Sequence, residues 1–295
     1  PVAGRAMIGH VLAAAESLSP ERVVVVVGPD MPQVAAAVAP HRTVVQAEAL
    51  GTADAVRAAE AELRELAAEG GEVLVLCGDG PLITPETLQA MVAARRAASA
   101  PAFVWLGMRP ADPTGYGRLV TGPDGGLLRI VEEKDASAAE RRIGLCWAGL
   151  LLAAGRDLLD LLARVDNDNA KGEYYLTSLA RLAAEAGVPA AVVETGDIEE
   201  VRGVNSRAEL AEAEALMQAR LRTKAMAGGA TLLDPASVWF SYDTQLGQDV
   251  LVEPNVFFGP GVSVGDGAEI RAFSHLEGAA VAAGARIGPF ARLRP

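Results

Sequence analysis

The chain has 295 residues, of which 51% are apolar, so the sequence is long and apolar enough for about two domains with cores of their own. It carries 26 Lys and Arg against 38 Asp and Glu, a net charge of −12, and has no basic block that would neutralise a run of phosphates. No apolar run reaches the ~20 residues that span a bilayer, and no export signal opens the chain. We therefore expect a cytoplasmic protein that binds neither nucleic acid nor membrane.

The cysteines and histidines point away from several kinds of chemistry. Cys77 and Cys146 both lie inside apolar runs, which is typical of reduced thiols rather than of a disulfide framework. The three histidines lie in separate elements without the spacing of metal ligands. The chain also has no Gly-x-Ser-x-Gly or Walker string, so serine hydrolysis and P-loop phosphate transfer are disfavoured.

The first two hundred residues alternate β-branched apolar runs with Ala/Leu/Glu-rich stretches, which predicts an α/β fold of βαβ units around a mainly parallel sheet. A Gly-rich turn at residues 124–126 separates two alternating runs and predicts an inserted β-hairpin, 117–121 with 127–132. The other strands are predicted at residues 22–28, 43–45, 72–77, 102–108 and 144–152, and the helices at residues 6–18, 52–68, 84–98 and 173–186.

A long helical pattern then leads into a region with a different period. Aliphatic or aromatic residues recur every six positions from Leu246 to Leu276, and after one step of five the series resumes at Val281. Such a hexapeptide repeat predicts a parallel β-helix. We expect three parts, a first domain at residues 1–205, a linker helix at 206–228 and the start of the β-helix at 229–295. Because the chain opens without Met and stops inside a coil, we expect it to be truncated at both ends.

Two motifs follow predicted strands. Asp79 comes directly after the strand 72–77, where doubly wound sheets bind ligands, and its carboxylate suits Mg²⁺; a helix N-cap or a simple turn is the alternative. In the second motif, the amide of Gln46 suits the edge of a nucleobase, while Gly51 allows close backbone approach. Thr52 can cap the helix that follows.

Three further strings carry polar groups but have simpler interpretations. Residues 112–118 place glycines around an aromatic and most often form a turn. Residues 130–134 end the predicted hairpin with a carboxylate and an amine that suit sugar hydroxyls and phosphate, although such a charge run is usually a solvated strand end. Asn205 precedes the long helix, so it is a candidate either for the helix cap or for a metal ligand.

Taken in order, these strings resemble the bacterial family of bifunctional N-acetylglucosamine-1-phosphate uridyltransferase/glucosamine-1-phosphate acetyltransferase enzymes, over almost the whole chain. The strings that carry the resemblance are residues 46–52 (QAEALGT), 78–83 (GDGPLI), 112–118 (DPTGYGR), 130–134 (IVEEK), 169–177 (NAKGEYYLT), 203–205 (GVN) and 287–295 (IGPFARLRP).

The resemblance implies a Rossmann-like nucleotidyltransferase domain followed by a left-handed parallel β-helix that forms a homotrimer. It implies that UTP and N-acetylglucosamine-1-phosphate react to UDP-N-acetylglucosamine and pyrophosphate with Mg²⁺ and without a covalent enzyme intermediate. A second activity in the full-length protein would acetylate glucosamine-1-phosphate from acetyl-CoA. Both reactions would serve the synthesis of cell-wall precursors.

The resemblance also assigns residues by their place in the matching strings. Uracil recognition falls on Gln46, Gly51 and Thr52, and the Mg²⁺ ligands on Asp79 and Asn205. The residues expected near the sugar are Gly78, Gly117 and Glu132, and Arg294 matches one residue of the acetyltransferase site; no residue is assigned a covalent catalytic role.

This chain departs from the family pattern in three places. The Gly-rich phosphate loop is expected upstream of Pro1, so we expect this chain alone to be a poor catalyst. Trp147 stands where the family usually has an Asn that touches the sugar, which suggests either a stacking residue or a core aromatic. The repeat also ends before the acetyltransferase residues. The alternatives are therefore a pyrophosphorylase for another sugar-1-phosphate, or a non-catalytic nucleotide-sugar binding and trimerisation scaffold.

Overall fold

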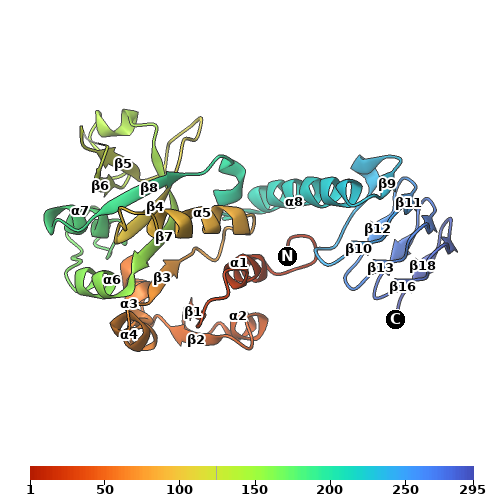
Figure 1. Ribbon diagram of the computed structural model, residues 1–295, viewed down its shortest axis with the longest axis horizontal. Helices are drawn as coiled ribbons and strands as arrows, with labels where there is room; N and C mark the ends of the chain where they lie inside the picture. The colour runs from red at the N-terminus through yellow and green to blue at the C-terminus, as the bar shows by residue number, and fades with distance from the viewer. Residues whose placement is uncertain (124) are drawn as a thin grey trace. The chain divides into compact units, whose positions relative to one another are not determined.

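A computed structural model describes residues 1–123 and 125–295. The chain forms two compact units (Figure 1), an α/β unit of Ile8–Gly203 and a second unit that joins Pro1–Met7 to Val204–Pro295. The bounds predicted from the sequence differ from these units, because they assign residues 1–7 to the first domain and make the linker helix a part of its own. The predicted domain bounds therefore remain a proposal. No helix in the described part is long and apolar enough to cross a membrane.

The α/β unit is built on a mixed sheet with the strand order β6-β5-β7-β4-β8, in which β3 also pairs with β7. The strands are β3 (Glu72–Val75), β4 (Phe103–Met108), β5 (Arg118–Thr121), β6 (Leu127–Val131), β7 (Cys146–Ala154) and β8 (Ala190–Glu194). β4 and β8 run parallel, but β7 runs antiparallel to both β3 and β4. The expectation of a mainly parallel sheet is therefore wrong here, because a run of apolar residues does not reveal the direction of its strand.

A separate parallel pair, β1 (Val24–Val27) and β2 (Arg42–Val45), lies outside this sheet. The predicted hairpin is present as β5 and β6, while Asp124 in its turn lies outside the described residues. The predicted helix at 52–68 is divided at Ala59, and α2, α6 and β8 were not predicted. The helices of this unit are α1 (Met7–Glu16), α2 (Pro32–Ala37), α3 (Thr52–Ala58), α4 (Glu60–Ala68), α5 (Pro85–Arg95), α6 (Gly155–Leu162) and α7 (Ser178–Glu185), with the 3₁₀ turns Glu140–Arg142 and Ile198–Val201.

The core of the α/β unit explains why β7 occupies the centre of the sheet. Every residue of its neighbour β4 is buried, and β7 itself carries buried residues along most of its length. Two helices with strongly one-sided apolar faces, α6 and α7, contribute Leu158, Leu162 and Leu179 to the same core. A strand that is covered on both faces needs an almost continuous apolar sequence, and residues 146–154 supply one.

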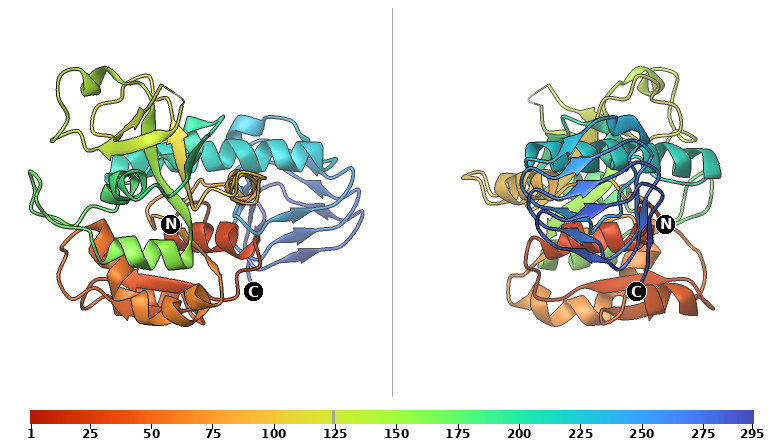
Figure 2. Two further views of the ribbon diagram at one scale, coloured as in Figure 1. Left: turned by 60° about the vertical axis from the view of Figure 1, so that its left-hand side comes forward. Right: turned by 90° about the vertical axis from the view of Figure 1, so that its right-hand side faces the viewer.

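In the second unit the hexapeptide repeat forms a left-handed parallel β-helix, as predicted. Figure 2 shows its short strands stacked in parallel layers. Each strand pairs with the strand one coil later, as Leu251 does with Glu269 and Glu269 with Arg286. The strands are β9 (Thr231–Leu232), β10 (Gln245–Leu246), β11 (Leu251–Val252), β12 (Phe257–Phe258), β13 (Ser263–Val264), β14 (Glu269–Ile270), β15 (His275–Leu276), β16 (Ala280–Val281), β17 (Arg286–Ile287) and β18 (Arg292–Leu293).

Helix α8 (Arg207–Ala227) packs against the β-helix core through apolar side chains such as Leu221 and Ala225, and it also contributes one fully buried polar side chain. Gln218 is fully buried, donates to the carbonyl of Phe240 at 2.7 Å and accepts from its N–H at 2.8 Å. These two bonds satisfy backbone groups at the open end of the solenoid, which has no preceding coil to pair with. The N-terminal residues join the same unit, because Ala3 donates to Glu214 of α8 at 2.7 Å.

Candidate active site

Gln46 follows β2 and has a fixed side-chain amide. Its backbone N–H extends the β1–β2 ladder by donating to Val27. Its amide nitrogen donates to the carbonyl of Gly51 at 3.0 Å and to the carboxylate of Asp54 at 2.9 Å. Both partners can only accept, so the NH₂ group must face them, and the amide oxygen is left without a protein donor in the described residues.

The loop that begins at Gly51 is clasped by a distant segment. Tyr174 donates its N–H to Leu50 at 2.7 Å and accepts from the N–H of Ala53 at 2.9 Å. Gly51 has φ 121°, and a Cβ there would lie 2.5 Å from the carbonyl oxygen of Tyr174, so this position requires glycine. The hydroxyl oxygen of Thr52 accepts from the N–H of Leu176 at 2.9 Å.

This clasp corrects one expectation about the loop. Gly51 occupies the N-cap position of α3 and Thr52 is the first helical residue, so Thr52 does not cap the helix. Its hydroxyl instead holds the segment that contains the paired tyrosines. We therefore find a structural reason for both Gly51 and Thr52, and their expected contact with uracil stays a prediction.

Glu132 and Gly117 come together beside the same segment. The hydroxyl of Thr177 donates to the Glu132 carboxylate at 2.9 Å, and a Cβ on Gly117 would lie 3.6 Å from both oxygens of that carboxylate. Burial raises the pKa of Glu132 above its ordinary value, even though the Thr177 hydrogen bond acts in the opposite direction. Desolvation of the Tyr175 hydroxyl raises its pKa to about 12, and the nearby carboxylates of Asp135, Glu132 and Glu173 contribute to the same shift.

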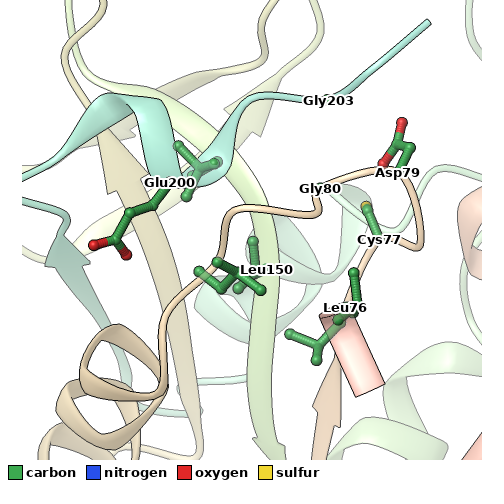
Figure 3. A pocket seen from close by; sticks show the side chains of 11 residues that line it. Leu76, Cys77, Asp79, Gly80, Leu150, Glu200 and Gly203 are labelled. Atoms are coloured by element: carbon green, nitrogen blue, oxygen red, sulfur yellow. The ribbon is translucent and has the colours of Figure 1, made fainter. Parts of the chain in front are cut away.

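Asp79 lies in the turn after β3 and lines a pocket (Figure 3). The carboxylate of Asp79 points away from the apolar side chains of Leu76 and Leu150 and has no protein partner in the described residues. Glu200 lines the same pocket, but its carboxylate is engaged by the hydroxyls of Thr84 at 2.9 Å and Thr87 at 2.6 Å. Asp79 is therefore the acidic side chain in this pocket that is open to a ligand.

The pocket is also bordered by a protonated thiol. Although Cys77 is an exposed residue, its sulfur lies 3.4 Å from the carbonyl oxygen of Gly149. Desolvation of that sulfur, with a smaller contribution from the charge of Asp79, raises the pKa of the thiol to about 11. Such a thiol is a poor nucleophile at neutral pH. Cys77 and Cys146 are both free, as the sequence predicts.

The donor set at Asp79 fits Mg²⁺ in the way that nucleotide enzymes commonly hold it. The described residues contain no group of three acidic, His or Cys side chains that could bind a metal. Mg²⁺ often takes one or two carboxylates and completes its shell with substrate phosphates and water, so a single free carboxylate suffices as an anchor. Asn205, the second expected ligand, belongs to the other unit, and its pairing with Asp79 remains a proposal.

The structure does settle the capping alternative for Asn205. Ser206 is the N-cap of α8 and forms a capping box with Glu209, which rules out Asn205 as the capping side chain. Asp79 is likewise not a cap, since Thr84 caps α5. Arg294 lies exposed just after β18 in the second unit, and its expected role in acetyl transfer stays a prediction.

Trp147 behaves as a core aromatic. Its indole N–H donates to the carbonyl of Leu150 at 3.1 Å, and its ring packs against that of Trp105 in a T-shaped arrangement at 5.8 Å. Its backbone N–H donates to Gly117 at 2.8 Å. The first half of β7 thus touches Gly117 through Trp147 and Cys77 through Gly149, so one strand links the Gly117–Glu132 pair to the Asp79 pocket.

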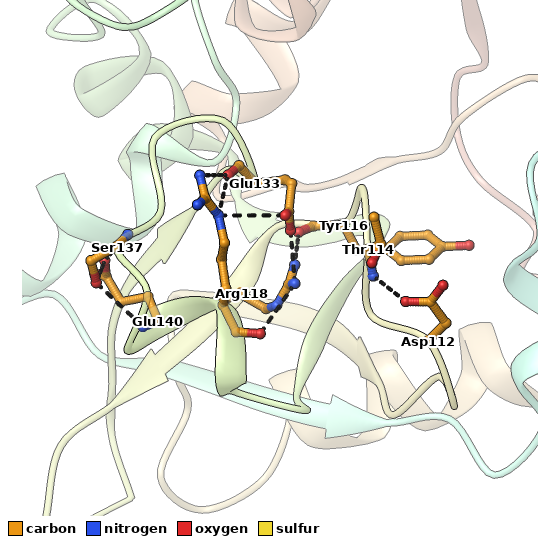
Figure 4. A network of polar contacts seen from close by, with 8 residues as sticks. Asp112, Thr114, Tyr116, Arg118, Glu133, Ser137 and Glu140 are labelled. Carbon is orange, nitrogen blue, oxygen red and sulfur yellow. Dashed lines mark hydrogen bonds and ion pairs between the residues drawn. The ribbon is translucent and has the colours of Figure 1, made fainter.

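The loop of residues 112–118 is held by a buried cation (Figure 4). Arg118 is 1% exposed and forms an ion pair with Glu133 at 2.7 Å, and its guanidinium also donates to the carbonyl of Tyr116. Hydrogen bonds from Thr114, first from its side chain and then from its backbone N–H at 3.0 Å, lower the pKa of Asp112. This string therefore forms an ordered loop that positions Gly117, and its charges are used internally.

Sequence reasoning missed several residues that complete the site. The sequence places Asp54 on a helix face and assigns no role to Tyr174 or Thr177. Tyr174 joins the clasp through its backbone, while its ring lies under the guanidinium of Arg57 at 4.4 Å. The two adjacent tyrosines were the available signal for the clasp, because helix packing alone does not ask for them. Tyr174 meets Leu50 across more than a hundred residues and Thr177 meets Glu132 across 45, and contacts of such reach leave no local pattern that would reveal them.

Comparison with known proteins identifies the family of this chain. Residues 1–182 match the family of the MobA-like NTP transferase domain. The whole chain is 54% identical to a protein of Paramagnetospirillum magneticum and 52% identical to one of Sphingopyxis alaskensis, and 96% of it is 60% identical to one of Rhodospirillum rubrum. All three are named "Bifunctional protein GlmU", and the chain spans 65%, 64% and 62% of their lengths. The resemblance stated from the motifs is thus confirmed, and the chain belongs to the family of MobA-like NTP transferase domains.

Proposed function

We propose that the chain is the nucleotidyl-transferring part of a bifunctional enzyme that forms UDP-N-acetylglucosamine and pyrophosphate from UTP and N-acetylglucosamine-1-phosphate. The observation that carries the proposal is the 54% identity over the full 295 residues to a bifunctional relative. The geometry of three groups of residues, one for each part of the substrates, supports it.

The base-binding group is formed by Gln46 and Gly51. The free amide oxygen of Gln46 is an acceptor, and the N–H of Gly51 has no protein acceptor in the described part of the chain. Uracil presents an N3–H donor next to a carbonyl acceptor. One acceptor and one neighbouring donor on the protein are complementary to that pattern.

The sugar-binding group is formed by Glu132 with Gly117. A carboxylate accepts hydrogen bonds from sugar hydroxyls, and the absence of a side chain at Gly117 leaves the Glu132 oxygens accessible on that side. Thr177 holds the carboxylate in place through its hydroxyl. Because Trp147 packs into the core, no observation here favours a different sugar over N-acetylglucosamine.

The phosphate-binding group centres on Asp79. Asn205 is proposed as a second metal ligand from the resemblance of its string alone. Bound Mg²⁺ would offset the negative charge that develops as pyrophosphate leaves. The protein's own part is positional: Gln46 orients the nucleotide and Glu132 orients the sugar, so that the sugar phosphate oxygen attacks the α-phosphorus in line. No protein nucleophile is needed, which agrees with the raised pKa of Cys77.

The test is release of pyrophosphate from UTP and N-acetylglucosamine-1-phosphate by the complete gene product that contains this chain. We expect release with Mg²⁺ and none with excess chelator. Glucose- and galactose-1-phosphate should be poorer substrates. A preference for a sugar without the acetamido group would contradict the proposed substrate, and a folded protein that releases no pyrophosphate would favour the scaffold alternative.

We further propose that the complete protein acetylates glucosamine-1-phosphate from acetyl-CoA with the help of Arg294, and that it acts in the cytosol as a homotrimer through the β-helix. Exposed aromatic side chains on the β-helix support the assembly: Phe273 and Phe290 are 56% and 75% exposed and stack at 5.2 Å. Such apolar surface commonly marks an interface. The mass of the protein in solution tests the trimer.

A further inference from the structure

Asp54 has an unusual position for an acidic residue in the first turn of a helix. Acidic residues there usually serve the helix dipole or pair with a cation. The carboxylate of Asp54 is half-buried, and its contact in the described residues is the amide nitrogen of Gln46, at 2.9 Å. It therefore acts on the side chain that we assign to the base.

Two acceptors fix the orientation of the Gln46 amide, and the charged one contributes more than the neutral one. The Gly51 carbonyl takes one hydrogen of the NH₂ group and the Asp54 carboxylate takes the other. If the amide turned over, its oxygen would face a carbonyl oxygen and a charged carboxylate, and two hydrogen bonds would become two repulsive contacts. The carboxylate contributes most to this preference, because hydrogen bonds to a charged acceptor are the stronger ones.

Resting on the proposed uridyltransferase function, we propose that Asp54 is a specificity-determining residue that selects uracil against cytosine by locking the Gln46 amide with its oxygen toward the base. Uracil carries a hydrogen at N3 and donates it to an acceptor. Cytosine has an unprotonated N3, which would face the Gln46 oxygen as a second acceptor. Asp54 does not need to touch the nucleotide, so its role is to position Gln46.

The substitution that tests this is Asp54→Asn, which keeps the shape of the side chain. An asparagine can either accept from the Gln46 NH₂ or donate to the Gln46 oxygen, so both amide orientations become possible. We expect the ratio of kcat/KM for UTP to that for CTP to fall about tenfold or more in the complete gene product, with CTP turnover rising. Asp54→Ala, which removes the locking acceptor, serves as a second variant and should lower the ratio in the same direction.

Two comparisons separate positioning from a general structural effect. Glu60→Gln removes the same charge from the adjacent helix α4, where Glu60 pairs with Arg64 at 2.6 Å, and should leave the UTP/CTP ratio unchanged. Gln46→Ala should itself weaken the preference for UTP, and adding Asp54→Asn to it should change the ratio no further, because the residue through which Asp54 acts is gone.

The outcomes are distinguishable from one another. An unchanged ratio in Asp54→Asn and Asp54→Ala overturns the inference, as does an equal loss of activity with both nucleotides, since a merely structural role predicts that result. If the unaltered protein releases pyrophosphate from neither UTP nor CTP, the proposed function fails, and the inference fails with it. A protein that turns over UTP but whose Asp54 variants keep full selectivity retains the function and loses only the inference.

Discussion

The two units bury their apolar residues through contacts of very different reach along the chain. In the β-helix paired strands lie 17 to 20 residues apart: His275 pairs with Arg292, Phe257 with His275 and Thr231 with Leu251. In the α/β unit Glu72 pairs with Ala154, and Tyr174 closes on Leu50. The first arrangement repeats a local rule, whereas the second brings distant segments together once, and the candidate site lies where they meet.

This difference separates stability from function. A solenoid coil depends on its neighbours, so a substitution at the first coil, away from Arg294, should weaken the structure without changing pyrophosphate release. In the α/β unit, loop residues such as Asp79 have few protein partners and are available for chemistry. Substitutions in the two units should therefore have opposite signatures.

The largest expected effect is on turnover. Asp79→Ala in the complete gene product should reduce Mg²⁺-dependent pyrophosphate release at least about a thousandfold, because metal stabilisation of the leaving charge is worth several kcal/mol. Its unfolding temperature should stay close to that of the unaltered protein, since the Asp79 carboxylate has no protein partner in the described residues. Steady-state assays beside a thermal melt provide the comparison.

Glu200→Gln is a matched control in the same pocket. It removes a carboxylate that is hydrogen-bonded to Thr84 and Thr87, so it should affect stability more than turnover. Substantial Mg²⁺-dependent activity in Asp79→Ala would show that Asp79 is not a metal ligand. It would also contradict the expectation that substitutions in the α/β unit mainly affect turnover.

The next effect should appear in stability alone. Gln218→Ala leaves both the N–H and the carbonyl of Phe240 without partners in a buried position, and this should lower the free energy of unfolding of the second unit by about 3 kcal/mol. Gln245→Ala, on the exposed side of β10, is the control and should change little. Denaturant unfolding monitored on the chain measures both; equal stability of the two variants would show that Gln218 does not close the solenoid.

How well each region could be predicted from the sequence depends on how far apart its contacting residues lie along the chain. The sixfold spacing of residues such as Val252, Phe258 and Val264 was enough to predict the β-helix, because all of them point into one core. The reversed direction of β7 was not predictable, since residues 146–154 are apolar in either direction. Of the site, Asp79 and Gln46 carry signals in their own strings, and both lie at strand ends as expected.

The remaining site residues could not be predicted individually. The contact of the Thr52 hydroxyl depends on the backbone of Leu176, more than a hundred residues away. Asp54 looks like an ordinary residue of a solvated helix face until Gln46 is seen beside it. Local sequence patterns report what a segment buries, but they do not report which loop closes over it.

The smallest effect concerns Glu132, which links stability and function at one carboxylate. Because burial raises its pKa in the folded state, the folded protein binds this proton more tightly than the unfolded chain does. Its contribution to the free energy of unfolding is therefore complete below the ordinary glutamate pKa, and it is lost as pH rises through the raised pKa. Glu132→Gln lacks this loss and should gain on the order of 2 °C in unfolding temperature relative to the unaltered protein across that window.

Ionisation of Glu132 should strengthen substrate binding although it lowers the stability of the fold. Only the ionised carboxylate accepts hydrogen bonds at both oxygens, so KM for N-acetylglucosamine-1-phosphate should rise as pH falls through the raised pKa, while KM for UTP changes less. Glu132→Gln should have a high KM for the sugar phosphate at every pH, and the exposed Glu48→Gln should behave like the unaltered protein. If the pH dependence of this KM persists in Glu132→Gln, another group binds the sugar. If it disappears, the ionised Glu132 carboxylate both binds the substrate and lowers the stability of the folded protein in the same pH range.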